Sequence, residues 1–302
     1  MVYDVIIVGG GPAGLSASIY SSRARLKTLL IEKNGCGGQM IVTDLLENYP
    51  GFNKGINGFD LAVKLESQAR DFGTEIVYDE VIEIKNGNIK KVLTLNSVYD
   101  AKTVIIAAGT RVKEMNIPGE AKFKGNGVSF CATCDAPFYK DKEVLVVGGG
   151  DSAIQEAIYL AKFTKKVTIL HRRSGLRATK ILQERMLSYS NISIMYNTIP
   201  KEIIGEEQIK EVIITDLKTN QDEHLRVDGV FVFIGLVPNT SFSIGVDIDE
   251  NGYILTDENM HTSIDGIFAC GDIREKHLRQ VVTAASDGAQ AAVAAVYYID
   301  TL

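Results

Sequence analysis

Two cysteines separated by two residues, Cys131 and Cys134, have the types and spacing in this sequence that most directly allow chemistry. In such a pair one thiolate attacks a partner disulfide, forms a mixed disulfide, and is then resolved by the neighbouring thiol. The same spacing also occurs in zinc sites, which would need two further ligands. The other cysteines, Cys36 and Cys270, are isolated, and the four histidines show no ligand-like pairing. The pair therefore favours two-electron dithiol chemistry, and we expect no metal.

An acidic residue, Asp135, follows Cys134 directly. A carboxylate at this place could carry a proton to or from a leaving thiolate, provided that the side chain is buried. Without the adjacent cysteines, a helix cap or a surface turn would be an equally good interpretation. We expect the catalytic group to consist of Cys131, Cys134 and Asp135.

The start of the chain has the pattern of a nucleotide-binding unit. Residues 2–8 predict a buried strand, and residues 9–14 read Gly-Gly-Gly-Pro-Ala-Gly. Residues 15–25 have the composition of a helix, and residues 27–31 predict a second strand. Glu32 ends that strand, 18 residues after the last glycine of the loop. This order and spacing are typical of the dinucleotide fingerprint.

Each position of this fingerprint has a physical role. Gly9 allows the tight turn, Gly11 lets the backbone approach a pyrophosphate, and Gly14 lets the helix pack close to the strand. The N–H groups at the start of the helix are free to bind the phosphates. Glu32 can accept hydrogen bonds from ribose hydroxyls.

The same pattern recurs shortly after the two cysteines. Residues 143–147 predict a strand, and residues 148–153 read Gly-Gly-Gly-Asp-Ser-Ala. Residues 154–163 predict a helix, and residues 166–170 predict another strand. Where the first unit has its acid, residues 171–173 read His-Arg-Arg. The chain therefore contains two copies of one supersecondary plan.

The basic residues of the second copy predict which nucleotide it binds. His171, Arg172 and Arg173 replace a carboxylate, and Arg177 lies about one turn further on. Guanidinium groups at that strand end suit a 2′-phosphate rather than a ribose diol. We therefore expect the second nucleotide to be NADPH rather than NADH.

The last part of the chain, from about residue 240, has no glycine loop of its own. It contains an apolar strand at residues 266–270 and a long Ala-rich helix at about residues 279–299. A segment of roughly 60 residues is marginal as an independent domain, so we expect it to complete the first unit.

The predicted fold is thus α/β, with two Rossmann-like nucleotide-binding domains, the second inserted into the first. The expected boundaries are 1–113 with 243–302 for the first domain, and 114–242 for the second, which carries the two cysteines. The two crossings are extended links, and a domain joined by two short links can rotate as a body.

Composition and charge exclude several classes of protein. The chain is 45% hydrophobic and 23% charged, as in soluble globular proteins. A net charge of −6 gives no indication of a nucleic-acid or anionic-membrane partner. The apolar runs fall short of the roughly 20 residues of a membrane-spanning helix. The start of the sequence shows neither a basic region nor a cleavage site, so we expect a cytoplasmic protein.

In combination, these motifs resemble the low-molecular-weight (bacterial-type) thioredoxin reductases, which are of the FAD/NAD(P)-binding, pyridine nucleotide-disulfide oxidoreductase type. Seven features stand in the order and spacing of that family and cover essentially the whole chain. They are residues 9–14, Gly37-Gly38-Gln39, residues 47–51 (Glu-Asn-Tyr-Pro-Gly), residues 131–135, residues 148–153, His171-Arg172-Arg173 with Arg177, and Gly271-Asp272 with Arg279-Gln280.

The resemblance implies a flavoprotein that passes electrons from NADPH through FAD and the dithiol to thioredoxin. On the family pattern Cys134 faces the flavin, Cys131 attacks thioredoxin and Asp135 is the acid/base. The resemblance also implies that the inserted domain rotates between the half-reactions and that the protein is a homodimer. The residues implied to bind FAD are Gly9, Gly11, Pro12, Ala13, Gly14, Glu32, Gly38, Gln39, Thr43, Asn48, Gly109, Gly271, Asp272, Arg279, Gln280 and Val281. Those implied to bind NADPH are Gly148, Gly150, Asp151, Ser152, Ala153, His171, Arg172, Arg173 and Arg177.

Five alternatives compete with this interpretation. A ferredoxin-dependent flavin thioredoxin reductase would not need the intact second glycine loop or the arginines after it. The reductase of a peroxide-scavenging system would carry an additional thioredoxin-like region. A redox sensor would not need both nucleotide sites and Asp135. A glutathione-type reductase would place a C-x-x-x-x-C pair in the FAD domain and add a dimerisation domain. A reductase for another small dithiol protein also stays open.

Overall fold

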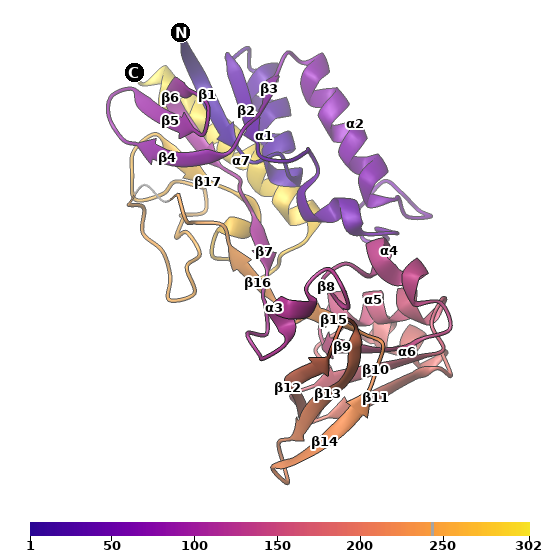
Figure 1. The fold of residues 1–302 in the computed structure, drawn as a ribbon. Helices are drawn as coiled ribbons and strands as arrows, with labels where there is room; N and C mark the ends of the chain where they lie inside the picture. The colour runs from indigo at the N-terminus through magenta and orange to yellow at the C-terminus, as the bar shows by residue number, and fades with distance from the viewer. Residues whose placement is uncertain (243–244) are drawn as a thin grey trace. The chain divides into compact units, whose positions relative to one another are not determined.

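The computed structural model describes residues 1–242 and 245–302 and divides into two compact units. The first unit consists of Met1–Arg111 and Val237–Leu302, and the second is Val112–Leu236. Figure 1 shows both chain ends in the first unit. The predicted start of the returning segment, residue 243, lies outside the described residues.

The first unit is built on a sheet of order β3-β2-β1-β6-β5-β4, with β17 paired to β6. Strands β1, β2, β3, β6 and β17 pair in parallel, whereas β4 and β5 are antiparallel. The strands are β1 (Val2–Val8), β2 (Thr28–Glu32), β3 (Glu75–Tyr78), β4 (Val81–Lys85), β5 (Lys90–Thr94), β6 (Val98–Ile106) and β17 (Ile267–Ala269). The helices are α1 (Pro12–Arg23), η1 (Gly38–Val42), α2 (Gly58–Asp71), η3 (Gly271–Ile273) and α7 (Val281–Asp300).

Helices α1 and α7 pack closely together against one face of this sheet (Figure 1). The contact is close because small residues line it: a Cβ added at Gly288 would lie 2.0 Å from the carbonyl oxygen of Ala13. The hydroxyl of Ser16 also donates to the carbonyl of Ala285 at 2.7 Å. The start of α1, where the first glycine loop ends, is therefore held by the C-terminal helix.

The second unit has a five-stranded parallel sheet of order β11-β10-β9-β15-β8 and a three-stranded antiparallel sheet of order β12-β13-β14. Its strands are β8 (Val128–Ser129), β9 (Glu143–Gly148), β10 (Lys166–His171), β11 (Ile192–Tyr196), β12 (Thr198–Gly205), β13 (Ile209–Asp216), β14 (Gln221–Arg226) and β15 (Gly229–Phe233). Its helices are α3 (Glu120–Phe123), α4 (Ala132–Asp135), η2 (Ala136–Tyr139), α5 (Asp151–Ala161) and α6 (Lys180–Leu187). One largely parallel sheet and one fully parallel sheet, with helices between their parallel strands, confirm the predicted α/β class.

The chain passes between the units through two short strands, β7 (Thr110–Val112) and β16 (Leu236–Pro238), which pair with each other. Backbone hydrogen bonds flank this pair: Lys113 donates to Gly235, and Asn239 donates to Gly109, both at 3.0 Å. The two crossings of the chain therefore lie side by side.

Most predicted elements are present with small shifts at their ends. Helix α1 starts at Pro12 rather than at residue 15, because proline is favoured in the first turn of a helix. It ends before Arg25, whose φ of 64° lies outside the helical region. Helix α7 starts at Val281 because Gln280 caps it and forms a capping box with Thr283. In the part of the chain that the structure describes, no helix is long and apolar enough to cross a membrane.

Candidate active site

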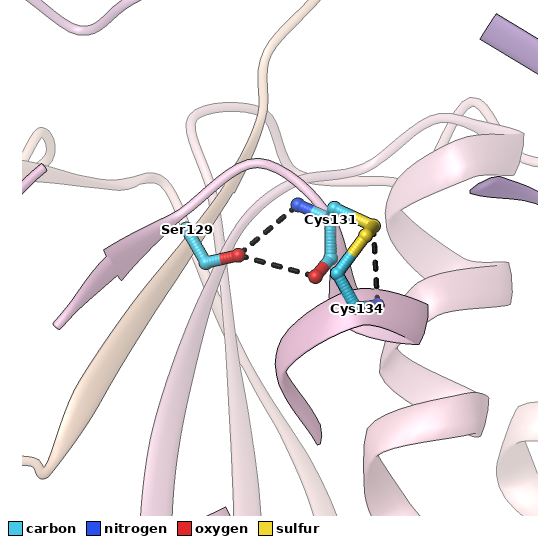
Figure 2. The surroundings of a disulfide bond; sticks show 3 residues. All are labelled: Ser129, Cys131 and Cys134. Atoms are coloured by element: carbon cyan, nitrogen blue, oxygen red, sulfur yellow. Dashed lines mark hydrogen bonds between the residues drawn. A yellow bond between two sulfur atoms is a disulfide. The ribbon is translucent and has the colours of Figure 1, made fainter. Parts of the chain in front are cut away.

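The two cysteines of the motif form a disulfide at the start of α4 (Figure 2). Their Cα atoms lie 5.4 Å apart, and Cys131 is the N-cap residue of the helix. The Sγ atom of Cys131 accepts a hydrogen bond from the backbone N–H of Cys134 at 3.1 Å. Such a donor stabilises a thiolate at Cys131 once the disulfide is reduced. The side chain of Cys131 is half-buried and that of Cys134 is exposed.

A serine that the sequence analysis did not single out holds the backbone of Cys131. The hydroxyl of Ser129 accepts from the N–H of Cys131 at 3.1 Å and donates to its carbonyl at 3.2 Å (Figure 2). Local bonds of this kind fix the backbone where a strand turns into a helix. A serine two residues before a cysteine is too common to have been recognised from sequence.

Asp135 is the last residue of α4, and its side chain is half-buried. Its backbone N–H donates to the carbonyl of Cys131 at 3.3 Å, which closes the turn that carries both sulfur atoms. Burial raises the pKa of Tyr139, and the charge of Asp135 adds to that rise. The carboxylate therefore lies within electrostatic reach of a buried phenol, while its acid/base role stays a prediction.

The first glycine loop has the geometry that its motif predicts. Gly9 has a φ of 105°, and a Cβ there would lie 2.5 Å from the carbonyl oxygen of Ala107. A Cβ at Gly14 would lie 1.8 Å from the carbonyl oxygen of Gly9. At Gly11, in contrast, nothing lies within 4 Å of an added Cβ. The loop is closely packed at its two ends and open at the position expected to face a pyrophosphate.

Glu32 lies at the end of β2 and reaches back to this loop. Its carboxylate accepts from the N–H of Gly10 at 2.6 Å and from the N–H of Asn34 at 2.9 Å. Each oxygen keeps a further lone pair, so the carboxylate can still accept a ribose hydroxyl. Glu32 thus contributes to the shape of the loop as well as being the expected ribose acceptor.

Segments that are distant in sequence meet around this loop. A Cβ at Gly38 would lie 3.2 Å from the Cα of Gly11, and the amide of Gln39 donates to the carbonyl and hydroxyl oxygens of Thr110 at 2.6 and 2.7 Å. The amide of Asn48 donates to the side chain of Gln280 at 3.0 Å. These contacts join residues 38–48 to three other parts of the first unit, at Gly11, Thr110 and Gln280.

Two buried polar atoms near the start of α7 have no hydrogen-bond partner among the described residues, namely Oδ1 of Asp272 and Nε of Arg279. Burial raises the pKa of Asp272, although Lys276 and Arg279 act in the opposite direction. The guanidinium of Arg279 stacks on the ring of Tyr253 at 3.9 Å. Buried polar groups normally have partners, so an acceptor and a donor left over here fit a bound cofactor with polar groups.

The remaining residues of the expected FAD set lie along the same segments. Pro12 and Ala13 are the first residues of α1, Val281 is the first residue of α7, and Thr43 follows η1. Gly109 precedes β7 and has a φ of 59°. A Cβ added at Gly271 would lie 2.7 Å from the Cβ of Ala13. Their contacts with FAD stay a prediction.

The second glycine loop repeats this arrangement between β9 and α5. A Cβ at Gly148 would lie 2.3 Å from the carbonyl oxygen of Phe233, whereas at Gly150 nothing lies within 4 Å. His171 packs beneath the loop, since a Cβ at Gly149 would lie 2.2 Å from its Nδ1. Burial lowers the pKa of His171, so its ring is neutral at pH 7. His171 is thus a packing residue of the loop, in addition to belonging to the expected NADPH set.

The three arginines of the expected NADPH site are all exposed. The backbone N–H of Arg177 donates to the carbonyl of Gly149 at 2.7 Å, which places the basic segment against the glycine loop. Asp151, Ser152 and Ala153 form the first turn of α5, where the carboxylate of Asp151 accepts from the N–H of Thr179 at 2.7 Å. The structure therefore joins the two halves of the expected NADPH site.

Two further residues were missed from the sequence, Lys276 and Asp287. They form a buried ion pair of 2.9 Å beside Asp272. A signal was present, because Asp287 stands in a helix that is otherwise mostly alanine and other apolar residues. A charge on the buried face of such a helix requires a partner.

Comparison with known proteins places this geometry in a family. The profile of the family described as "Pyridine nucleotide-disulphide oxidoreductase" matches residues 3–288. A thioredoxin reductase of Treponema pallidum (strain Nichols) is 48% identical over 301 residues, which is 99% of this chain and 98% of that protein. A thioredoxin reductase of Bacillus subtilis (strain 168) is 46% identical over 305 residues, covering 100% of this chain and 96% of that protein.

A solved structure agrees with these relatives. The crystal structure of Lactococcus lactis thioredoxin reductase in its FR conformation superposes with a TM-score of 0.97 at 42% identity. The match covers 99% of this chain and 100% of the other.

Proposed function

Because this chain belongs to the low-molecular-weight thioredoxin reductases of the pyridine nucleotide-disulphide oxidoreductase family, we propose that it uses NADPH and FAD to reduce the disulfide of thioredoxin. The observation that carries the proposal is the Cys131–Cys134 disulfide, which lies in the same compact unit as the second glycine loop. A dithiol that only stabilised the fold would not need a nucleotide loop or an adjacent acid.

FAD is proposed for the first unit. Gly11 leaves space for a pyrophosphate, and Glu32 has lone pairs for a ribose. Asp272 and Arg279 each offer a buried polar atom that has no hydrogen-bond partner in the described part of the chain. The chemistry that FAD would supply there is two-electron transfer between NADPH and the disulfide. The residues of the chain bind and orient this cofactor and hold the dithiol.

The dithiol step is proposed to use Cys131 as the nucleophile. Its thiolate, stabilised by the N–H of Cys134, attacks one sulfur of the thioredoxin disulfide, and a mixed disulfide forms as the other thioredoxin sulfur leaves as a thiolate. The thiolate of Cys134 then attacks Sγ of Cys131, which restores the Cys131–Cys134 disulfide and releases thioredoxin as a dithiol. Asp135 is proposed to supply a proton to a leaving thiolate.

NADPH is proposed for the second unit. Arg172, Arg173 and Arg177 are exposed beside the glycine loop, where guanidinium groups can bind a 2′-phosphate in a bidentate way. The open position at Gly150 leaves room for the pyrophosphate.

The test is anaerobic stopped-flow absorbance of the purified protein mixed with NADPH, with oxidised thioredoxin in excess. We expect the flavin to bleach and NADPH to be consumed in step with thioredoxin. Cys131→Ser or Cys134→Ser should abolish thioredoxin reduction and leave flavin bleaching in place. A flavin that NADPH leaves oxidised would contradict the proposal and make ferredoxin the donor to test.

We also propose that the protein is a homodimer and acts in the cytoplasm. The family resemblance supports the homodimer. A redox-active dithiol persists in its reduced form in a reducing compartment, which supports the cytoplasm. Light scattering after size exclusion should give twice the mass of one chain.

A further inference from the structure

A cluster of buried charges in the first unit lies beside the expected flavin residues. Side chains of Lys276, Asp287 and Arg274 are only 8%, 10% and 14% exposed. Burying charges is costly unless they are paired, so their arrangement needs an account.

Asp287, on α7, is the centre of this cluster. Its Oδ2 accepts from the backbone N–H of Gly271 at 3.1 Å, from Nζ of Lys276 at 2.9 Å and from Nη1 of Arg274 at 3.4 Å. Gly271 directly precedes Asp272, and Lys276 follows it by four residues. One carboxylate therefore holds the loop on both sides of Asp272.

Lys276 forms ion pairs with two carboxylates, but it is close enough for a hydrogen bond to Asp287 alone of the two. Its Nζ is 2.9 Å from Asp287 but 3.9 Å from Oδ1 of Asp272. That Oδ1 is buried and has no hydrogen-bond partner within residues 1–242 and 245–302. The ammonium has three N–H donors, but its position against Asp287 holds it beyond hydrogen-bond distance of Asp272. The pairing with Asp287 therefore leaves Oδ1 of Asp272 without a hydrogen bond from Lys276.

We propose that Asp287 is a positioning residue for flavin binding: by holding Lys276, it keeps the carboxylate of Asp272 free to accept a hydrogen bond from FAD. This inference rests on the proposed flavin site. Asp287 then contributes to FAD binding through Lys276, without contacting FAD itself.

The role predicts the effect of two substitutions. Asp287→Asn keeps an oxygen for the N–H of Gly271 but removes the charge that holds Lys276. Lys276 then pairs with Asp272 and competes with FAD for it. FAD should leave the Asp287→Asn holoenzyme about tenfold faster than wild type, because one hydrogen bond to a charged group is lost. Adding Lys276→Met removes the competitor, so the double variant should release FAD at nearly the wild-type rate.

The experiment follows the fluorescence of FAD released when each holoenzyme is diluted, with circular dichroism to show that the variants are folded. Asp300→Asn, the same change at an exposed position of α7, is the control and should release FAD like wild type. Replacing the Lys276–Asp287 pair by neutral residues is usually tolerated. Arg274 loses its 3.4 Å contact with Asp287 but keeps its hydrogen bond to the hydroxyl of Thr256 at 2.8 Å, so the double variant should fold.

The outcomes separate the inference from the proposed function. Fast release from Asp287→Asn together with slow release from the double variant supports the positioning role. Unchanged release from Asp287→Asn, or equally fast release from the double variant, overturns it. Loss of the wild-type circular dichroism spectrum in Asp287→Asn also overturns it, because FAD would then leave an unfolded site. A wild-type protein that neither contains nor retains FAD overturns the proposed function itself.

Discussion

At the scale of single residues, the four cysteines differ in what surrounds each sulfur. Cys131 and Cys134 are joined at the start of α4, where the backbone N–H of Cys134 donates to Sγ of Cys131. Burial, with the charges of Glu66 and Glu32, raises the pKa of Cys36 to about 12. Cys270 is fully buried, and this raises the pKa of its thiol. Only the thiolate form is reactive, so the isolated cysteines are protected by their surroundings.

Alkylation should therefore distinguish the cysteines. After reduction, Cys131 and Cys134 should react with iodoacetamide at pH 8, while Cys36 has a thiolate fraction roughly a thousandfold below that of a free cysteine. Cys270 should react only on unfolding. Mass spectrometry of tryptic peptides gives the sites directly. Rapid labelling of Cys36 in the native protein would contradict the burial described here.

The exposed arginines of the second unit should decide nucleotide preference. Arg172→Ala should raise the KM for NADPH about tenfold or more and leave that for NADH unchanged, because the lost bond goes only to the 2′-phosphate. Steady-state kinetics with both nucleotides measures this. Arg226→Ala, which removes an exposed arginine from β14, is the matched control and should change neither value. An equal rise in KM for NADPH and NADH would show that Arg172 does not bind the 2′-phosphate.

Site residues that belong to a sequence motif were predicted from the sequence. Residues that contribute only by contacting other site residues were missed. Gly9, Gly14 and Glu32 lie where the fingerprint requires, because their roles depend on backbone contacts of nearby segments. Lys276 and Asp287 were missed because their pairing depends on how α7 packs against a loop. Spacing along the chain carries no information about that contact.

At the scale of elements, each strand–loop–helix unit contains glycines that pack closely and one, Gly11 or Gly150, where an added Cβ has space. Gly14→Ala should destabilise the fold by about 4 kcal/mol, because its Cβ would strike a backbone oxygen that cannot move cheaply. Gly11→Ala has room and an ordinary φ of −71°, so the unfolding free energy of the apoprotein should hardly change. The Gly11→Ala variant should nevertheless bind FAD poorly, because the added Cβ would occupy the space where we expect the pyrophosphate.

Denaturant unfolding and the FAD content per chain measure these two effects. Gly150→Ala is the matched control in the other unit, where the same open geometry occurs. It should weaken NADPH binding and retain FAD. If Gly11→Ala keeps its full FAD content, the loop does not bind the pyrophosphate.

Element types were predictable, and their ends were less so. Buried strands such as β1 and β9 have long apolar runs with little alternation, as parallel strands with covered faces require. Helix ends shifted by up to three residues because Pro12 and Gln280 set them through local capping. The short α4 was not predicted, since four residues have no periodicity to detect.

At the scale of the whole molecule, each nucleotide should slow hydrogen exchange only in the unit that binds it: FAD in the first unit and NADP⁺ in the second. Hydrogen exchange with NADP⁺ at about 100 times its Kd should slow exchange in the loop after β9 and at residues 171–177 by up to about a hundredfold. Exchange of residues 9–14 should not change. Protection of the first loop by NADP⁺, or of neither loop, would contradict the assignment of one nucleotide to each unit.

The pairing of β7 with β16 bears on the order in which the chain acquires its structure. In the first unit, β17 pairs with β6 through Ile267 and Val104, partners separated by the entire second unit. Closing so long a loop from an unfolded chain is slow and entropically costly. Once the second unit has folded, its two ends leave side by side through β7 and β16, and the effective loop is short. Folding of the inserted unit thus shortens the loop that the first unit must close, so a destabilising change inside Val112–Leu236 should delay completion of the first unit's sheet.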